Sequence, residues 1–281
     1  MKKKSISICI LRAGGTNCDQ ETKIALESCG AKAEIIHTNK VIQEKRLRDF
    51  HGLVIPGGFS FGDYVRAGAI WGDIIRHELR EEIETFVEMG RPVLGICNGF
   101  QVLVEAGILP GLDGFEDTQS VALAGNIPSG YRCTWTAKNS FLQIRHENSG
   151  KCIFTRLIPK GELLRLPIAH AEGRLVFPIG REKDFFRRLV DQDQIVFRFS
   201  LDGRPADGEF PFNPNGSAYD ITAICNSTGT VCGMMPHPER AFFKHQLPSW
   251  TAPDLTQAGD NGDGRRIFES MINYISEEIV P

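Results

Sequence analysis

The chain has 281 residues, of which 41% are hydrophobic and 24% are charged, the composition of an ordinary soluble globular protein. Its net charge of -3 at pH 7 gives no general attraction to nucleic acid or to an anionic membrane, so neither is expected as a partner. No apolar stretch approaches the length of a membrane span, and the run after the N-terminal lysines is too short for a signal peptide.

The eight cysteines are scattered along the chain, and no two have the two-residue spacing typical of zinc or redox motifs. Several lie in apolar runs, where a cysteine acts as a small hydrophobic side chain. We therefore expect a reduced, cytoplasmic protein with at most one chemically special thiol and no metal site.

The first half of the chain alternates between strand-like and helix-like patterns. Short apolar runs predict strands at 5–11, 33–37, 52–55 and 93–96. Helical spacing predicts helices over 18–29, 70–87 and from Cys97 to Gly107, with a shorter amphipathic piece at 41–47. This alternation predicts a parallel sheet covered by helices on both faces, with its site at the carboxyl ends of the strands.

The rest of the chain has a different rhythm. Pro and Gly divide short β-prone runs, which predicts antiparallel strands at 131–136, 141–144 and 163–166. Residues 181–188 are charged and indicate a solvated helix or an insertion. The last third predicts strands at 221–225 and 231–235, a loop over 248–264, and a closing helix whose apolar face is Ile267, Phe268, Met271, Ile272 and Ile275.

Together these patterns predict an α/β fold, an open, mostly parallel sheet with helices on both faces plus a smaller antiparallel β portion. No internal repeat or low-complexity tract divides the sequence. Residues 1–281 are therefore expected to form a single domain.

Cys97 lies where the strand at 93–96 gives way to a helix. Gly95 and Gly99 would let that strand and helix pack closely while the turn residue projects above the sheet edge, the arrangement of a nucleophile elbow. The amides and the dipole of the following helix would favour a thiolate. The alternative is a buried structural cysteine beside a helix start.

His237 lies in Pro236-His237-Pro238-Glu239, directly after an apolar strand, and Pro238 favours an extended conformation for it. Residues two apart in an extended segment face the same way, so Glu239 can accept from one ring nitrogen while the other faces the thiol. A histidine between prolines is more often a turn or packing residue. Paired with an elbow cysteine in a parallel-sheet protein, it is better interpreted as the base that a thiolate nucleophile needs.

The Pro56-Gly57-Gly58 turn also ends a strand, so it is expected at the same edge of the sheet. Its glycines allow amides to converge on an anion, which makes the N–H groups of Gly58 and Asn98 candidates for stabilising a tetrahedral oxyanion. An ordinary strand-ending turn is the alternative.

Residues 56–68 are also expected to switch the site between an incomplete and a complete state. Their glycines permit a peptide to turn an oxyanion N–H into or out of the site with little steric cost. The aromatic side chains of this segment, Phe59, Phe61 and Tyr64, are expected to be exposed and read by a partner. Alternatively, the turn is rigid and its aromatics pack into the core.

Longer motifs carry a resemblance. Gly95-Ile96-Cys97-Asn98-Gly99-Phe100-Gln101 with the late Pro-His-Pro-Glu resembles the class I (triad) glutamine amidotransferases, whose fold is flavodoxin-like. Further motifs resemble the glutaminase subunits of phosphoribosylformylglycinamidine synthase, namely those at 15–19, 56–68, 168–174, 213–217 and 234–240. The matches run in the family's order from about residue 6 to 240. Departures are Ala13-Gly14 before the first motif, an expanded 181–193 region and a long tail after Arg240.

The resemblance implies a role for each matched position. Cys97 would be the nucleophile, His237 the general base and then acid, and Glu239 the residue that orients the histidine, with oxyanion amides from Gly58 and Asn98. Gln101 matches a glutamine-contacting position, and Glu172 and Gly173 would approach the same substrate. The implied reaction is hydrolysis of L-glutamine through a thioester, which releases ammonia.

The resemblance also implies the partners. The chain has no Walker A motif, so it needs no cofactor of its own, and ATP and magnesium would belong to a synthetase subunit, with room for a small accessory subunit. That subunit would convert formylglycinamide ribonucleotide (FGAR) into formylglycinamidine ribonucleotide (FGAM) in purine biosynthesis. The alternatives are an amidotransferase subunit of another synthetase, a stand-alone α/β cysteine hydrolase, and a non-catalytic scaffold.

Overall fold

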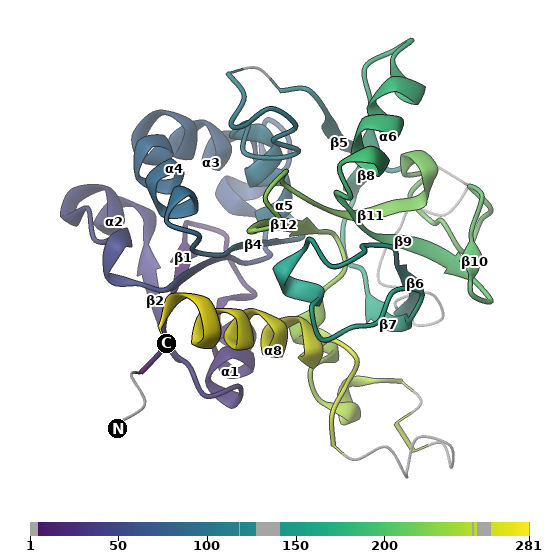
Figure 1. Ribbon diagram of the computed structural model, residues 1–281. Helices are drawn as coiled ribbons and strands as arrows, with labels where there is room; N and C mark the ends of the chain where they lie inside the picture. The colour runs from purple at the N-terminus through teal and green to yellow at the C-terminus, as the bar shows by residue number, and fades with distance from the viewer. Residues whose placement is uncertain (1–4, 118, 128–140, 249, 252–259, 281) are drawn as a thin grey trace.

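The computed structural model describes residues 5–117, 119–127, 141–248, 250–251 and 260–280. A ten-stranded sheet runs through this part of the chain in the order β2-β1-β3-β4-β12-β11-β9-β6-β7, with β10 paired to β9 (Figure 1). The first five strands in that order are parallel, namely β2 (Lys32–His37), β1 (Ser7–Arg12), β3 (Gly52–Ile55), β4 (Val93–Ile96) and β12 (Val231–Met234). The predicted open, mostly parallel sheet is confirmed.

The antiparallel portion is also confirmed, although most of it continues the main sheet. The antiparallel strands there are β11 (Ile221–Cys225), β9 (Ile195–Leu201), β6 (Phe141–His146), β7 (Leu163–Pro167) and the short β10 (Arg204–Pro205). A separate two-stranded sheet pairs β5 (Ala122–Gly125) with β8 (Glu172–Val176). The predicted strand at 131–136 lies outside the described residues.

Helices cover both faces of the sheet (Figure 1). On one face lie α1 (Asp19–Ser28) and the closing helix α8 (Arg265–Tyr274), and on the other lie α3 (Ala69–Ile74), α4 (Arg80–Glu88) and α5 (Asn98–Glu105). The short α2 (Thr38–Glu44) follows β2 and covers most of the predicted amphipathic piece. Of the five predicted apolar residues, Ile267, Phe268 and Met271 of α8 are buried, Ile272 is partly buried, and the buried Ile275 begins the π-helical turn that follows α8.

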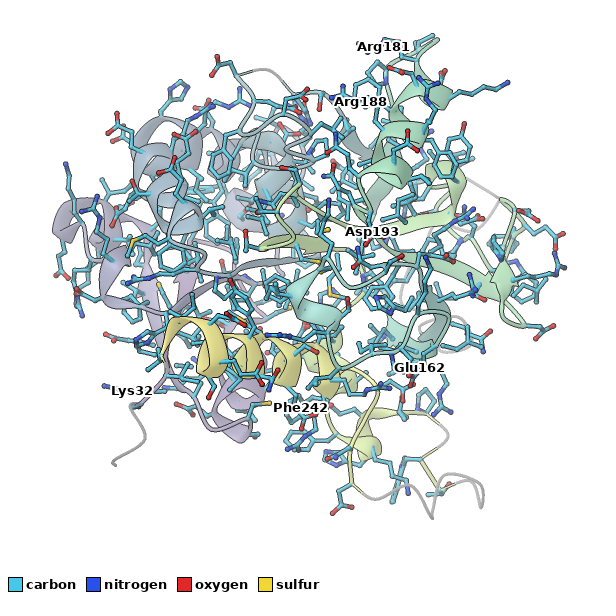
Figure 2. The ribbon with its side chains drawn as sticks, viewed as in Figure 1. Lys32, Glu162, Arg181, Arg188, Asp193 and Phe242 are labelled. Atoms are coloured by element: carbon cyan, nitrogen blue, oxygen red, sulfur yellow. The ribbon has the colours of Figure 1, made fainter. Side chains whose placement is uncertain are left out.

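Two predicted helices differ from the pattern that predicted them. The segment 70–87 is interrupted between α3 and α4 by a π-helical turn, Ile75–Leu79, although Ile75, Leu79, Ile83 and Phe86 still face the core. The charged piece at 181–188 is helix α6 (Glu182–Asp191), which is only half solvated because Phe185 and Leu189 are buried. In Figure 2, α6 stands at the edge of the molecule with Arg181 at its outer end. The described residues of 248–264 form turns apart from an isolated bridge between Asn261 and Phe243, in agreement with the predicted loop.

Candidate active site

Cys97 occupies the junction between β4 and α5, as predicted. Its φ of 50° and ψ of -104° fall in a region that residues with a side chain rarely adopt, which is the strained turn of a nucleophile elbow. A Cβ on Gly99 would overlap the carbonyl of Ile55, and one on Gly95 would lie 2.7 Å from the carbonyl oxygen of Gly99. The two glycines therefore let helix α5 sit against the sheet, and the turn is fixed by the packing around it.

His237 and Glu239 form a buried pair next to this turn. The ring Nδ1 lies 2.5 Å from Glu239 Oε1, and neither residue exposes more than 1% of its surface. His237 is extended (φ -100°, ψ 94°), as Pro238 predicts. Glu239 instead lies in the short 3-10 helix Pro238–Ala241, so the predicted contact forms through a tight turn rather than along an extended segment.

The charge of His237 depends on its neighbours. Burial lowers the pKa of the imidazole, but Glu239 and then Cys97 raise it more, so that the pKa lies well above its usual value. Nε2 is buried and forms no hydrogen bond with the residues that the structure describes. The Cys97 thiol is near enough to influence the ring without a closed hydrogen bond, and such contacts commonly tighten when substrate binds.

The Pro56-Gly57-Gly58 turn lies against the same two side chains. A Cβ on Gly57 would be 2.8 Å from His237 Cε1 and 3.5 Å from Cys97 Cβ. Gly58 has φ 153° and forms an isolated antiparallel bridge with Thr16. The hydrogen bonds of that bridge run from Phe59 N–H to the Gly15 carbonyl (3.0 Å) and from Asn17 N–H to the Gly57 carbonyl (3.4 Å). The N–H of Gly58 itself takes no part in the bridge, as an oxyanion donor requires.

In the segment after this turn, some of the aromatic side chains are exposed and one packs into the core, so each predicted alternative holds in part. Phe59 and Tyr64 are 53% and 90% exposed. Phe61 instead is partly buried and packs against the core. The exposed large hydrophobic side chains of the loop are therefore Phe59, Tyr64 and the neighbouring Val65.

Gln101, Glu172 and Gly173 come together beside the elbow. The Gln101 side chain accepts from Asn98 Nδ2 at 3.0 Å and donates to the Glu172 carbonyl, so both ends of its amide are bound to protein. The carboxylate of Glu172 accepts from Ala67 N–H at 3.0 Å. Contact of these residues with glutamine remains a prediction, while here they connect α5, the 56–68 loop and the start of β8.

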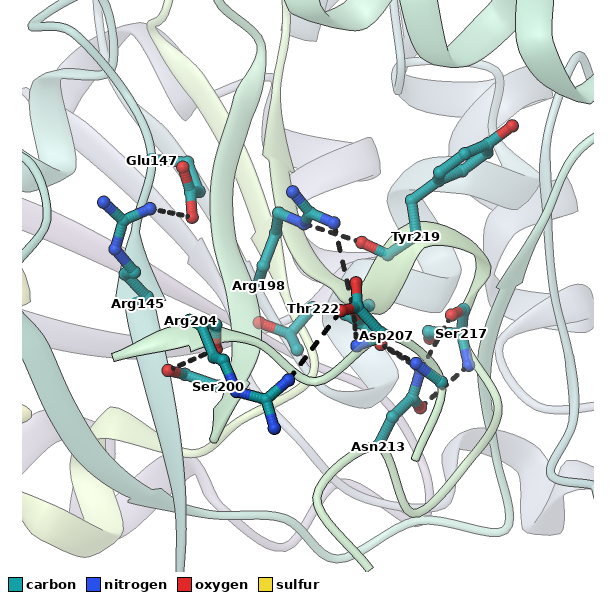
Figure 3. Close-up of polar contacts among 12 residues, drawn as sticks. Arg145, Glu147, Arg198, Ser200, Arg204, Asp207, Asn213, Ser217, Tyr219 and Thr222 are labelled. Atoms are coloured by element: carbon teal, nitrogen blue, oxygen red, sulfur yellow. Dashed lines mark hydrogen bonds and ion pairs between the residues drawn. The ribbon is translucent and has the colours of Figure 1, made fainter. Parts of the chain in front are cut away.

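The backbone of Gly173 is also bound by the turn at residues 213–217. Asn215 Nδ2 donates to its carbonyl at 2.9 Å. The turn that presents Asn215 is closed by Asn213, whose Nδ2 donates to the Ser217 carbonyl at 2.9 Å (Figure 3). The Asn213–Ser217 motif therefore supports the start of β8, where Glu172 and Gly173 lie.

Sequence reasoning gave no role to Cys18 or Arg240, although both lie in the motifs that carry the resemblance. Cys18 Sγ is 4.0 Å from His237 Nδ1 and accepts from Arg240 Nη2 at 3.1 Å. Arg240 Nε is 3.4 Å from Glu21 Oε1 and 3.9 Å from Glu239 Oε1. Burial raises the pKa of the Cys18 thiol. This group lies behind the histidine ring, on the side of Glu239.

Among the described residues, one set of side chains has the donor types of a metal site, namely Cys18, His237 and Glu239, whose ligand atoms lie within 4.8 Å of one another. Their atoms are already engaged, because His237 Nδ1 bonds Glu239 and Cys18 bonds Arg240. We therefore interpret the set as a hydrogen-bonded group.

An open α/β sheet that presents a strained cysteine beside a buried histidine–glutamate pair defines a class, the triad glutamine amidotransferases. A family model described as "CobB/CobQ-like glutamine amidotransferase domain" matches residues 5–275. The chain is 42% identical to phosphoribosylformylglycinamidine synthase subunit PurQ of Archaeoglobus fulgidus, over 99% of this chain and 100% of that protein. It is 44% identical to the PurQ subunit of Methanothrix thermoacetophila, over 96% of this chain and 98% of that protein. The chain therefore belongs to the PurQ family, the glutaminase subunits of phosphoribosylformylglycinamidine synthase.

Solved structures agree with this assignment. A chain of the PurLQS structure from Thermotoga maritima matches with a TM-score of 0.67 and 30% identity, over 96% of this chain and 99% of that chain. A glutamine amidotransferase of Thermotoga maritima matches with a TM-score of 0.53 at 16% identity, which supports the fold alone. None of the helices in the described ranges is long and apolar enough to cross a membrane.

Proposed function

We propose that this chain hydrolyses L-glutamine through a thioester on Cys97 and passes the ammonia to a synthetase subunit that converts FGAR into FGAM in de novo purine biosynthesis. The observation that carries the chemistry is the strained Cys97 turn beside the His237–Glu239 pair. Similarity to PurQ proteins along nearly the whole chain supports FGAR as the molecule that accepts the ammonia.

In the first half of the proposed reaction, the Cys97 sulfur attacks the side-chain carboxamide carbon of glutamine and its proton passes to His237. Negative charge develops on the carboxamide oxygen. The N–H groups of Gly58 and Asn98 would stabilise that oxyanion. Asn98 directly follows the nucleophile, Gly58 directly follows a glycine that lies against it, and the Gly58 N–H is not used by the bridge.

In the second half, His237 donates its proton to the departing nitrogen, and the tetrahedral intermediate collapses to a thioester and ammonia. Water, activated by His237, then hydrolyses the thioester to glutamate and restores the thiol. Glu239 keeps the ring in one orientation and stabilises its protonated form, in agreement with the raised pKa of His237.

ATP and magnesium would act in the partner, which activates the FGAR amide for attack by ammonia. The similar Thermotoga maritima chain belongs to a structure of PurLQS, and this similarity supports association with a synthetase subunit and an accessory subunit. The seven described cysteines are free thiols, and we propose a cytoplasmic location on that basis.

The direct test mixes the purified chain with its synthetase subunit, glutamine, ATP, magnesium and FGAR, and measures FGAM and glutamate. We expect both products. Hydrolysis of glutamine with no FGAM would identify the subunit of another synthetase. Hydrolysis of other amides without preference for glutamine would identify a stand-alone hydrolase.

A further inference from the structure

His170 is a buried side chain that the proposed reaction does not use. It lies between β7 and β8 and exposes only 6% of its surface. Neither Nδ1 nor Nε2 has a hydrogen-bond partner in the part of the chain that the structure describes. Buried polar groups in folded proteins nearly always have a hydrogen-bond partner. An exception at a functional site indicates that the unpaired atom binds a substrate or product there.

Asn126 fixes the backbone on both sides of the His170 ring. Asn126 donates through Nδ2 to the His170 carbonyl at 2.9 Å and through its N–H to the Ala171 carbonyl at 2.9 Å, and its Oδ1 accepts from Gly173 N–H at 3.1 Å. The ring lies where a side chain on residue 173 would begin, since a Cβ there would overlap the imidazole. The backbone that carries the ring is therefore fixed, and only a glycine at position 173 leaves room for the ring in this position.

His170 directly follows a residue that contacts the nucleophile. The carbonyl of the preceding residue, Ala169, lies 3.8 Å from Cys97 Sγ. Burial, and then the nearby His237, lower the pKa of His170 to about 3. The imidazole is therefore neutral at every pH at which the enzyme would work, and one of its nitrogens always offers a lone pair.

We propose that His170 is a positioning residue for ammonia: it accepts a hydrogen bond from the ammonia released at Cys97 and holds that molecule unprotonated for transfer to the synthetase. This inference rests on the proposed function. Ammonia in water at neutral pH is largely ammonium, which has no lone pair for attack. A neutral, enclosed acceptor binds ammonia without supplying a proton, and no covalent step is involved. His237 is poorly suited to that task because it must activate water for hydrolysis of the thioester.

The test uses the complete complex with glutamine, ATP, magnesium and FGAR, and measures the ratio of FGAM formed to glutamate formed. We expect a ratio near one for the unsubstituted protein. His170→Leu and His170→Phe remove the acceptor nitrogen, and we expect each to lower the ratio at least threefold. His170→Asn keeps a neutral hydrogen-bonding group and should restore most of it. His77→Leu, at an exposed histidine on the π-helical turn, is the matched control and should keep the ratio.

Two readouts separate this role from a structural one. FGAM synthesis driven by added ammonium salt should be the same in all variants, because it bypasses Cys97. A raised KM for glutamine with an unchanged product ratio in the Leu and Phe variants would overturn the proposal, as would a parallel loss of both products. Failure of the proposed function looks different, because the unsubstituted complex would then form glutamate but no FGAM.

Discussion

The side chain of Asn98, the first residue of α5, accepts a hydrogen bond through Oδ1 from the N–H of Ser60 at 3.2 Å. Asn98 exposes 1% of its surface and Ser60 exposes 2%, so water does not compete for this contact. The helix that begins at the nucleophile is thereby tied to the loop that carries Gly58. The Asn98 side chain sets the position of that loop, and its backbone amide is the second candidate oxyanion donor.

Asn98→Ala should separate these two contributions. The variant keeps the backbone amide and loses the bonds to Ser60 and Gln101, which should cost about 1–3 kcal/mol of unfolding free energy. We expect kcat for glutamine hydrolysis to fall about tenfold, equivalent to about 1.4 kcal/mol, because the loop no longer holds Gly58 in place. Asn273→Ala, on the exposed side of α8, is the control. A fall in stability with unchanged kcat would contradict the positioning role.

Cys97→Ser should fold and lose glutamine-dependent activity by about 10³-fold or more. A serine hydroxyl is far less ionised at neutral pH and is a weaker nucleophile than a thiolate. Ammonium salt supplied to the complex should bypass the defect, which steady-state FGAM formation measures. Near-normal glutamine turnover would remove Cys97 from the role of nucleophile.

His237→Asn and Glu239→Gln should differ in severity. The first removes proton transfer and should cost about 10³-fold or more in kcat, whereas the second weakens orientation and should cost about 10²-fold. Single-turnover hydrolysis of glutamine measures both. Equal losses would mean that Glu239 does more than orient the ring, and an unaffected His237→Asn would exclude His237 from the reaction.

The same pair predicts a dependence of stability on pH. The folded protein holds the His237 proton more tightly than the unfolded chain, since the pKa of His237 is raised. Its contribution to stability is therefore fully present below a pH of about 6.5 and is lost as the pH rises through the raised pKa. Glu239→Gln removes the group that raises the pKa most, so the difference in Tm between the natural protein and the variant should shrink from pH 6 to pH 9. A difference that grows with pH would contradict a raised pKa for His237.

Gly57→Ala tests the packing of the turn against the triad. The φ of Gly57 is not positive, so the backbone tolerates a side chain, but the new Cβ would lie 2.8 Å from His237 Cε1 and 3.1 Å from Cys18 Sγ. The ring must shift, and a small displacement of a catalytic group should lower kcat about tenfold to 100-fold. Gly14→Ala, where a Cβ meets nothing within 4 Å, is the control and should keep full activity.

Phe59 and Tyr64 should mediate stimulation by the synthetase. Replacing both with serine removes exposed aromatic surface that contributes strongly to interfaces, so we expect binding to weaken about tenfold to 100-fold and the synthetase-dependent rise in kcat to be lost. Ile179→Ser, at a side chain that is 98% exposed, is the control. Calorimetry and glutaminase assays with and without the synthetase measure these effects. A chain whose glutaminase activity is full in isolation and unchanged by the synthetase would exclude a switching role for residues 56–68.

The sequence predicted the parallel half of the fold because each strand there is a short apolar run between turn signals. The Cys97 elbow and the His237–Glu239 contact could also be predicted from the sequence, because each depends on neighbours within a few positions. The proximity of Cys18 to His237 could not be predicted, because 219 positions separate them and only the order of strands in the sheet brings them together. The backbone position of His170 likewise depends on Asn126, which lies 44 positions away.

The placement of β12 has a consequence for biosynthesis of the protein. This strand lies inside the sheet between β4 and β11, in register with β4 from Val231 opposite Val93 to Met234 opposite Ile96. It comes late in the chain, and His237 and Glu239 follow it. The N–H of Cys97 donates to the carbonyl of Met234 at 2.7 Å, so β12 completes the elbow as well as presenting the base. A nascent chain on the ribosome therefore cannot hydrolyse glutamine until its last third has emerged and β12 has entered the centre of the sheet.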